Sequence, residues 1–160
     1  MKELELKFTL RVFENTNELS KPDAELLEAA KNALKDSYSP YSGFKVAAAA
    51  LLANGKTVAG TNQENAAYPV CLCAEATVLS ACSALYPEIA INKIAITVKS
   101  KSHVVNHPVA PCGVCRQRIA EYENRFNNNI EIILMGEEGQ VYSVNTVKDI
   151  LPLTFTKADL

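Results

Sequence analysis

Segments typical of β-strands alternate with segments typical of α-helices along this chain of 160 residues, and this order constrains the fold more than any other feature. Such alternation favours an α/β domain in which helices cover a sheet. The dipeptide Asn54-Gly55 is a strong hairpin signal and makes at least one strand pair antiparallel. The predicted fold class is therefore α/β, a three-layer α-β-α sandwich with a mixed central sheet of about five strands, plus an extra N-terminal strand. We expect strands at residues 4–12, 46–53, 56–61, 91–98, 130–135 and 140–144, long helices at residues 20–39, 73–85 and 112–126, and a short helix at residues 146–151.

The extra strand is predicted from strict alternation at the N-terminus. Apolar and polar residues take turns there, which is typical of a half-buried strand. Residues 1–13 are accordingly interpreted as an N-terminal strand extension that lengthens a sheet edge or forms an interface. The whole chain, residues 1–160, has the length of a single domain. The large apolar residues that share one face of this strand are Leu4, Leu6, Phe8, Leu10 and Val12.

Composition and charge narrow the function classes. Apolar residues make up 48% of the chain and charged residues 21%, which is typical of a globular protein. Sixteen basic residues against eighteen acidic ones give a formal charge of −2, so we expect no nucleic-acid partner, since polynucleotide binders carry a basic excess or stripe. The longest apolar run, residues 46–53, is far shorter than the ~20 residues that span a bilayer, and no signal-peptide core precedes it. We therefore expect a cytoplasmic protein with no membrane partner.

The five cysteines cluster in a way that indicates a metal site. Cys73 and Cys112 each begin a predicted helix, where free backbone N–H groups and the helix dipole favour thiolate. Three thiolates around Zn²⁺ leave a fourth position open for water, as in catalytic sites, whereas Cys71 as a fourth ligand would close a structural site. The cysteines alone do not choose between these two interpretations, and metal-free buried thiols are a weaker third. Cys82 has no partner at ligand spacing and is expected in the core.

Glu75 favours the open site. Beside a zinc ion with four thiolate ligands, its carboxylate would be repelled and would have no chemical role. Beside a zinc ion with a free coordination position, it could transfer protons. Zn²⁺ lowers the pKa of a bound water to about 7. The zinc deaminase signature is a His or Cys followed by x-Glu, then Pro-Cys-x-x-Cys. This chain has Cys73-Ala-Glu75 and then Pro111-Cys112-Gly-Val-Cys115.

With these motifs the chain resembles the small, all-cysteine cytidine deaminases over residues 39–155. The resemblance implies one Zn²⁺ per subunit, a homotetramer, and hydrolytic deamination of cytidine or deoxycytidine to the uridine product and ammonia in pyrimidine salvage. Each matching string is short, and their specificity comes from their shared order. The strings are Tyr41-Ser-Gly-Phe-Lys-Val46, Asn62-Gln-Glu-Asn-Ala-Ala-Tyr-Pro69, Cys73-Ala-Glu75, Pro111-Cys-Gly-Val-Cys-Arg-Gln117 and Leu151-Pro-Leu-Thr-Phe155.

The resemblance also implies a role for each matching residue. Zinc would be held by Cys73, Cys112 and Cys115, and Glu75 would carry protons from water to ring N3 and to the departing amine. The residues implied to bind substrate are Asn62 and Glu64 (ribose hydroxyls), the backbone N–H of Ala74 (pyrimidine O2), Phe44 (base), and Tyr68 and Phe155 (neighbouring subunits' pockets).

One residue departs from the family pattern beside the site. The family usually has arginine after Cys-Ala-Glu, and this chain has Ala76. Because three thiolates give a Zn²⁺ centre a net negative charge, a nearby cation would lower the cost of the site. We hypothesise that Arg116 or Arg118 supplies part of that compensation.

Alternative functions remain open from the sequence. A nucleoside deaminase of the blasticidin S type is similar and does not need arginine after Cys-Ala-Glu. A non-catalytic zinc-binding relative would have a closed four-thiolate site that includes Cys71. Deamination of polynucleotides is disfavoured by the acidic balance and the lack of a basic, aromatic strand-binding stripe.

Overall fold

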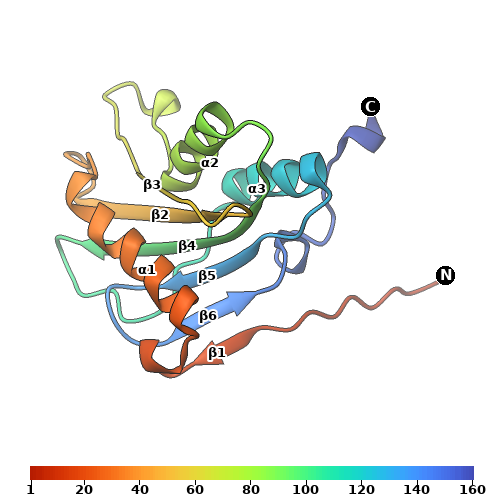
Figure 1. The fold of residues 1–160 in the computed structure, drawn as a ribbon, viewed down its shortest axis with the longest axis horizontal. Coiled ribbons are helices and arrows are strands. Elements are labelled where there is room, and N and C mark those ends of the chain that lie inside the picture. The colour runs from red at the N-terminus through yellow and green to blue at the C-terminus, as the bar shows by residue number, and fades with distance from the viewer.

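A six-stranded sheet is the centre of the computed structural model, which describes residues 1–160 (Figure 1). Its spatial order is β1-β6-β5-β4-β2-β3. The pair β4–β5 is parallel and the other neighbours are antiparallel, so the prediction of a mixed sheet is confirmed. The strands are β1 (Arg11–Phe13), β2 (Phe44–Leu52), β3 (Thr57–Thr61), β4 (Ile91–Ser100), β5 (Glu131–Met135) and β6 (Val141–Val144).

Helices cover both faces of the sheet, which confirms the three-layer architecture. Helix α1 (Lys21–Ala33) packs on one face, while α2 (Ala74–Leu85) and α3 (Gly113–Phe126) pack on the other (Figure 1). Strand β2 shows why the layers pack closely. Its fully buried alanines alternate between the layers, Ala48 contributing to the core under α2 and α3 and Ala49 to the core under α1.

The helix ends follow local sequence signals. The hydroxyl of Ser20 accepts a hydrogen bond from the Asp23 amide and begins α1. This helix ends at Ala33 and continues as a 3₁₀ turn to Asp36, so it is shorter than the predicted residues 20–39. Cys73 and Cys112 are the N-cap residues of α2 and α3, as predicted. The predicted short helix at residues 146–151 is a single 3₁₀ turn, Val147–Asp149. No helix of the structure combines the length and apolarity needed to cross a bilayer.

The N-terminal strand is much shorter than predicted. An extra strand pairs with β6 at the sheet edge, but it comprises only Arg11–Phe13. The prediction of a half-buried strand over residues 4–12 is wrong, because the apolar side chains on its face are all exposed. The physical reason is the length of the partner: β6 ends at Val144, opposite Leu10, so residues 4–9 have no strand beside them. This segment extends away from the sheet (Figure 1).

A buried glutamate in α3 joins three parts of the fold. The carboxylate of Glu123 accepts hydrogen bonds from the amides of Ile130 (2.9 Å) and Val147 (3.0 Å) and from the hydroxyl of Thr146 (2.8 Å). The residue is only 3% exposed. It therefore ties α3 to the start of β5 and to the turn after β6.

Glu123→Ala should lower the free energy of unfolding by about 3 kcal/mol, since it leaves buried backbone donors without a partner. The measurement is urea unfolding monitored by circular dichroism. Glu121→Ala, at an exposed position of the same helix, is the matched control and should change stability by less than about 0.5 kcal/mol. Equal stability of the two variants would contradict the role assigned to Glu123.

Candidate active site

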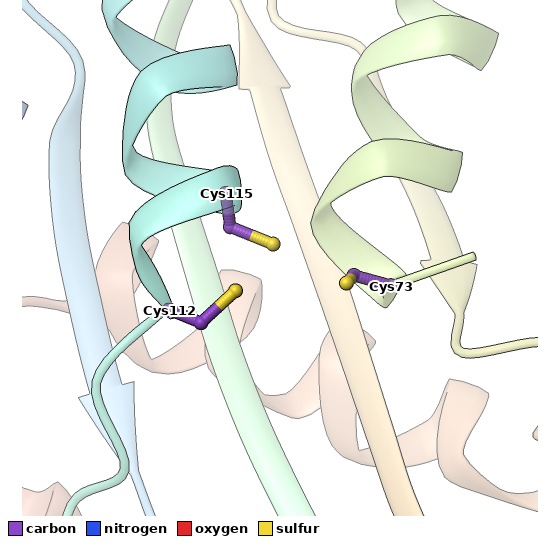
Figure 2. Close-up of side chains that lie close together, drawn as sticks. All are labelled: Cys73, Cys112 and Cys115. Carbon is purple, nitrogen blue, oxygen red and sulfur yellow. The ribbon is translucent and has the colours of Figure 1, made fainter. Parts of the chain in front are cut away.

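Three cysteine sulfurs meet at the N-termini of α2 and α3. Cys73 is the N-cap of α2, Cys112 is the N-cap of α3, and Cys115 lies in the first turn of α3. Their Sγ atoms all lie within 4.8 Å of one another, and Figure 2 shows them directed at a common point between the helices. The two helices lie on the same face of the sheet, so both helix dipoles present their positive ends to these sulfurs. This is the donor set of a site for a thiophilic metal ion.

Burial and backbone hydrogen bonds act on the three thiols in opposite directions. The backbone amide of Cys115, followed by that of Val114, lowers the pKa of the Cys112 thiol. Burial raises the pKa of Cys73 and of Cys115, and the nearby Glu75 carboxylate raises both further. Without a metal ion, Cys73 and Cys115 therefore keep their protons more strongly than a free thiol does, and Cys112 keeps its proton less strongly.

Cys71 and Cys82 do not belong to this cluster. The sulfur of Cys71 accepts a hydrogen bond from the Asn65 amide (3.2 Å) and donates one to the Asn65 carbonyl (3.6 Å). Cys71 lies outside the three-sulfur group, which is the arrangement expected of an open site. Cys82 is in the core under α2 and α3, as predicted, and burial raises its pKa to about 11.

Glu75 is buried beside the cysteines and has no protein partner. It is 5% exposed, and no protein group donates a hydrogen bond to its carboxylate. It lines the same pocket as the three clustered cysteines, and its charge raises the pKa of each of them. A buried carboxylate with free lone pairs is available to bind and transfer protons.

A pocket of about 320 Å³ unites the cysteines, Glu75 and two of the predicted ribose-binding residues, Asn62 and Glu64. The backbone of Ala74 is also part of its lining. Such a volume suits a ligand the size of a nucleoside. Cys71 also lines the pocket, together with Val46 and Pro111 from the matching strings. The remaining walls are apolar side chains that no sequence motif indicated: Leu72, Ile96, Val98, Val109 and Ala110.

Part of this apolar wall can be recognised in the sequence, but only once it is known which strands pair. Val46 of β2 lies directly opposite Val98 of β4. Because side chains alternate along a strand, both share a face with Ile96, which lies in the core under α2 and α3. Period two in each segment predicts which residues share a face, but not which face is turned to the cysteines.

Most of the hydrogen-bonding groups of the Asn62 side chain are already bonded within the protein. Its Oδ1 accepts hydrogen bonds from the Ser37 hydroxyl (2.6 Å) and the Val46 amide (2.8 Å), and its Nδ2 donates to the Phe44 carbonyl (2.9 Å). Both oxygen lone pairs are therefore used and one amide hydrogen is free. Asn62 can offer a ligand one donor and no acceptor.

Glu64 is fixed to the turn before β2. Its carboxylate accepts hydrogen bonds from the amides of Tyr41 (2.9 Å) and Ser42 (3.2 Å) and from the Ser42 hydroxyl. The hydrogen bond from the Ser42 side chain is the main cause that lowers the pKa of Glu64. An ionised carboxylate held in this way is an acceptor for ligand hydroxyls.

Three of the predicted substrate-binding residues do not line this pocket: Phe44, Tyr68 and Phe155. Phe44 is partly buried at the start of β2. Tyr68 is 70% exposed, packed edge-on against Tyr41 at 6.1 Å between ring centroids, and Phe155 is 59% exposed in the C-terminal tail. Both exposed rings are free to contact another molecule.

Neither predicted arginine donates a hydrogen bond to a cysteine sulfur. The guanidinium of Arg116 donates instead to the carbonyls of Pro111 and Ile150, each at 2.8 Å, and so braces the residue before Cys112. Arg118 is exposed. Charge compensation by these arginines stays a prediction. The positive charge nearest the sulfurs is the partial charge of the two helix N-termini.

Comparisons with known proteins agree with this site. The model of the family described as the cytidine and deoxycytidylate deaminase zinc-binding region matches residues 20–127. A cytidine deaminase of Halalkalibacterium halodurans is 36% identical over 135 residues, which are 84% of this chain and 95% of that protein. The crystal structure of a cytidine deaminase from Burkholderia pseudomallei has 38% sequence identity and a TM-score of 0.70, covering 82% of this chain and 97% of that one. That of Mycobacterium tuberculosis has 30% identity and a TM-score of 0.64.

The fold and the three-cysteine pocket are those of a deaminase with a metal-binding region, and the match extends over both cysteine motifs. The chain belongs to the cytidine and deoxycytidylate deaminase family.

Proposed function

We propose that this protein catalyses the hydrolytic deamination of cytidine and deoxycytidine to uridine or deoxyuridine and ammonia, with one Zn²⁺ held by Cys73, Cys112 and Cys115. The observation that carries the proposal is the open three-sulfur cluster beside the unbonded carboxylate of Glu75. The sulfur spacing suits the ion, because Zn–S bonds of about 2.3 Å place tetrahedral ligands roughly 3.8 Å apart. When bound, Zn²⁺ supplies the Lewis acidity that makes a hydroxide nucleophile available at neutral pH.

Glu75 moves the protons. Deamination at C4 of the base needs a base for water, an acid for ring N3 and an acid for the leaving amine, and one carboxylate can serve these steps in turn. Glu75 is suited to this because its oxygens are not occupied by protein donors and it lines the pocket. The apolar walls exclude bulk water and strengthen these interactions.

Asn62 and Glu64 recognise the sugar. The free amide hydrogen of Asn62 donates to one ribose oxygen, and the Glu64 carboxylate accepts from a hydroxyl. The backbone N–H of Ala74, which lines the pocket, binds the pyrimidine O2. Phe44 lies outside the pocket lining, and its contact with the base rests on the resemblance alone. A substrate that lacks these hydroxyls would lose these hydrogen bonds, which gives selectivity.

The exposed rings of Tyr68 and Phe155 fit a homotetramer in which each is contributed to a neighbouring subunit's pocket. This assembly would bury both rings and close the nucleoside pocket. We further place the activity in pyrimidine salvage in the cytoplasm, a reducing compartment where unpaired thiolate ligands persist.

The substrate is tested by the loss of absorbance of cytidine, deoxycytidine and blasticidin S with the zinc-loaded protein. We expect turnover of cytidine and deoxycytidine, and little of blasticidin S. Turnover of blasticidin S alone would assign the chain to the other class of nucleoside deaminase, for which the presence of Ala76 leaves room. A zinc-loaded protein inert toward all three would contradict the proposed function.

Zinc affinity should rise steeply with pH. Below its pKa a thiol keeps its proton, and the raised pKa values of Cys73 and Cys115 keep two protons on the site at neutral pH. Zinc binding must displace at least these two, so the association constant should increase at least about 100-fold per pH unit between pH 6 and 8. Competition with a chelator of known pH dependence measures this slope. Cys71→Ser should have the same slope, and an affinity independent of pH would contradict the assignment of ligands.

A further inference from the structure

The N-terminal arm, residues 4–12, exposes a row of large apolar side chains. Between 40% and 80% of each of these side chains is exposed. A chain segment with a free edge and a row of exposed apolar side chains tends strongly to pair with another chain. The arm also lies before the segment that the family model matches, residues 20–127, so the deaminase site does not account for it. The apolar members of the row are Leu4, Leu6, Phe8, Leu10 and Val12.

The arm presents an unpaired backbone edge as well as an apolar face. In the spatial order of the sheet, β1 is the last strand and has β6 on one side only. The residues before Leu10 have no strand on either side. Their exposed N–H and C=O groups are available to pair with another extended segment.

We propose that this arm pairs antiparallel with the same arm of a second copy of the chain, about a two-fold axis at Phe8. The arrangement is isologous, so one contact closes both free edges at once. It joins two six-stranded sheets through their β1 edges and does not depend on the deaminase proposal.

The sequence of the arm is self-complementary in this register. With Phe8 opposite Phe8 of the second copy, Leu6 lies opposite Leu10 and Leu4 opposite Val12, so every apolar residue meets an apolar one. On the other face Glu5 lies opposite Arg11, and Lys7 opposite Thr9.

Other registers are poorer. An axis at Lys7 places two lysines together, and an axis at Thr9 places Lys7 opposite Arg11. An axis at Leu6 pairs Glu5 with Lys7 favourably but sets Leu10 against Lys2 and leaves Val12 unmatched. Arg11 can serve its new partner in the preferred register, because only its Nη2 donates to Glu131, Ser143 and Asn145, and its Nε and Nη1 are free.

The paired apolar face has a place to lie. Val12 is opposite Tyr142, which packs on the core under α2 and α3, whereas Phe13 packs on the core under α1. The apolar row therefore faces the α3 side of the sheet. There the arm overhangs a hollow of about 500 Å³ lined by Leu6, Phe8, Ile150 and Pro152 and by four charged residues, Lys7, Arg116, Lys148 and Asp149. The apolar side chains of a second arm on the same face can pack against the apolar part of this lining.

Disulfide cross-linking tests the register directly. In Phe8→Cys the two new thiols lie opposite each other, with Cα atoms about 5 Å apart, within reach of a disulfide. In Thr9→Cys, the matched control, the thiols are offset by two residues and lie about 8 Å apart, out of reach. The probe is mild oxidation with diamide, read on a non-reducing gel against the wild type, which accounts for the native cysteines.

We expect a covalent pair in Phe8→Cys and only the wild-type background in Thr9→Cys. The second measurement is the mass of the assembly by analytical ultracentrifugation. Deletion of residues 2–9 should halve this mass, or raise the dissociation constant of the assembly at least 10-fold. Cross-linking of Phe8→Cys no greater than that of Thr9→Cys would overturn the proposal. An unchanged mass and dissociation in the deletion variant would also overturn it.

Discussion

Glu75→Gln lowers kcat/KM for cytidine by about 10²–10⁴-fold in our account, because the variant keeps the shape of the side chain but cannot accept or return a proton. Glu75 is the buried carboxylate beside the three cysteines, and no protein donor occupies it. The loss should appear in kcat more than in KM, since the carboxylate acts on the reacting atoms rather than on the sugar. The measurement is the absorbance change of cytidine under initial-rate conditions.

Two controls separate this effect from loss of the metal or of the fold. The zinc content of Glu75→Gln should equal that of the wild type, because Glu75 is not among the sulfur ligands. Glu121→Gln, on the exposed face of α3, should keep full activity. A Glu75→Gln enzyme with more than about a tenth of wild-type activity would exclude Glu75 as the proton carrier.

Cys115→Ser should weaken zinc binding by more than about 100-fold and abolish deamination. Cys71→Ser should leave zinc content and activity near those of the wild type, although Cys71 lies only two residues from Cys73. The difference follows from the geometry, since Cys115 belongs to the three-sulfur group and Cys71 is bonded to the Asn65 backbone instead. Zinc is measured by atomic emission after dialysis against a chelator. Equal losses in both variants would support a closed four-thiolate site.

Much of the metal site could be predicted from the sequence because its determinants are local. Cys112 and Cys115 are three residues apart at a helix start, and Cys73 begins a second helix, so each motif forms with its own backbone geometry. Only the fact that the two helix ends lie next to each other had to come from the structure. The alternation of strands and helices was sufficient to predict that both helices cover a sheet.

Two kinds of feature could not be predicted: those that depend on the length of a neighbouring strand, and those that depend on which hydrogen-bonding groups are already used within the protein. The alternation of residues 4–12 indicates a strand, but its pairing depends on β6, which ends at Val144. Which atoms of Asn62 remain free for a ligand could not be predicted, because its carbonyl oxygen is used by Ser37 and Val46, which belong to other segments. The hydrogen bond from Arg116 to the Ile150 carbonyl, 34 residues away, likewise depends on the fold, while charge compensation by Arg116 or Arg118 stays a prediction.

Zinc K-edge X-ray absorption of the wild-type protein decides how many sulfurs surround the ion. Our account predicts three sulfur neighbours at about 2.3 Å and one lighter oxygen neighbour at about 2.0 Å. The same spectrum is expected for Cys71→Ser. A first shell of four sulfurs in the wild type would leave no position for water and would contradict the proposed chemistry.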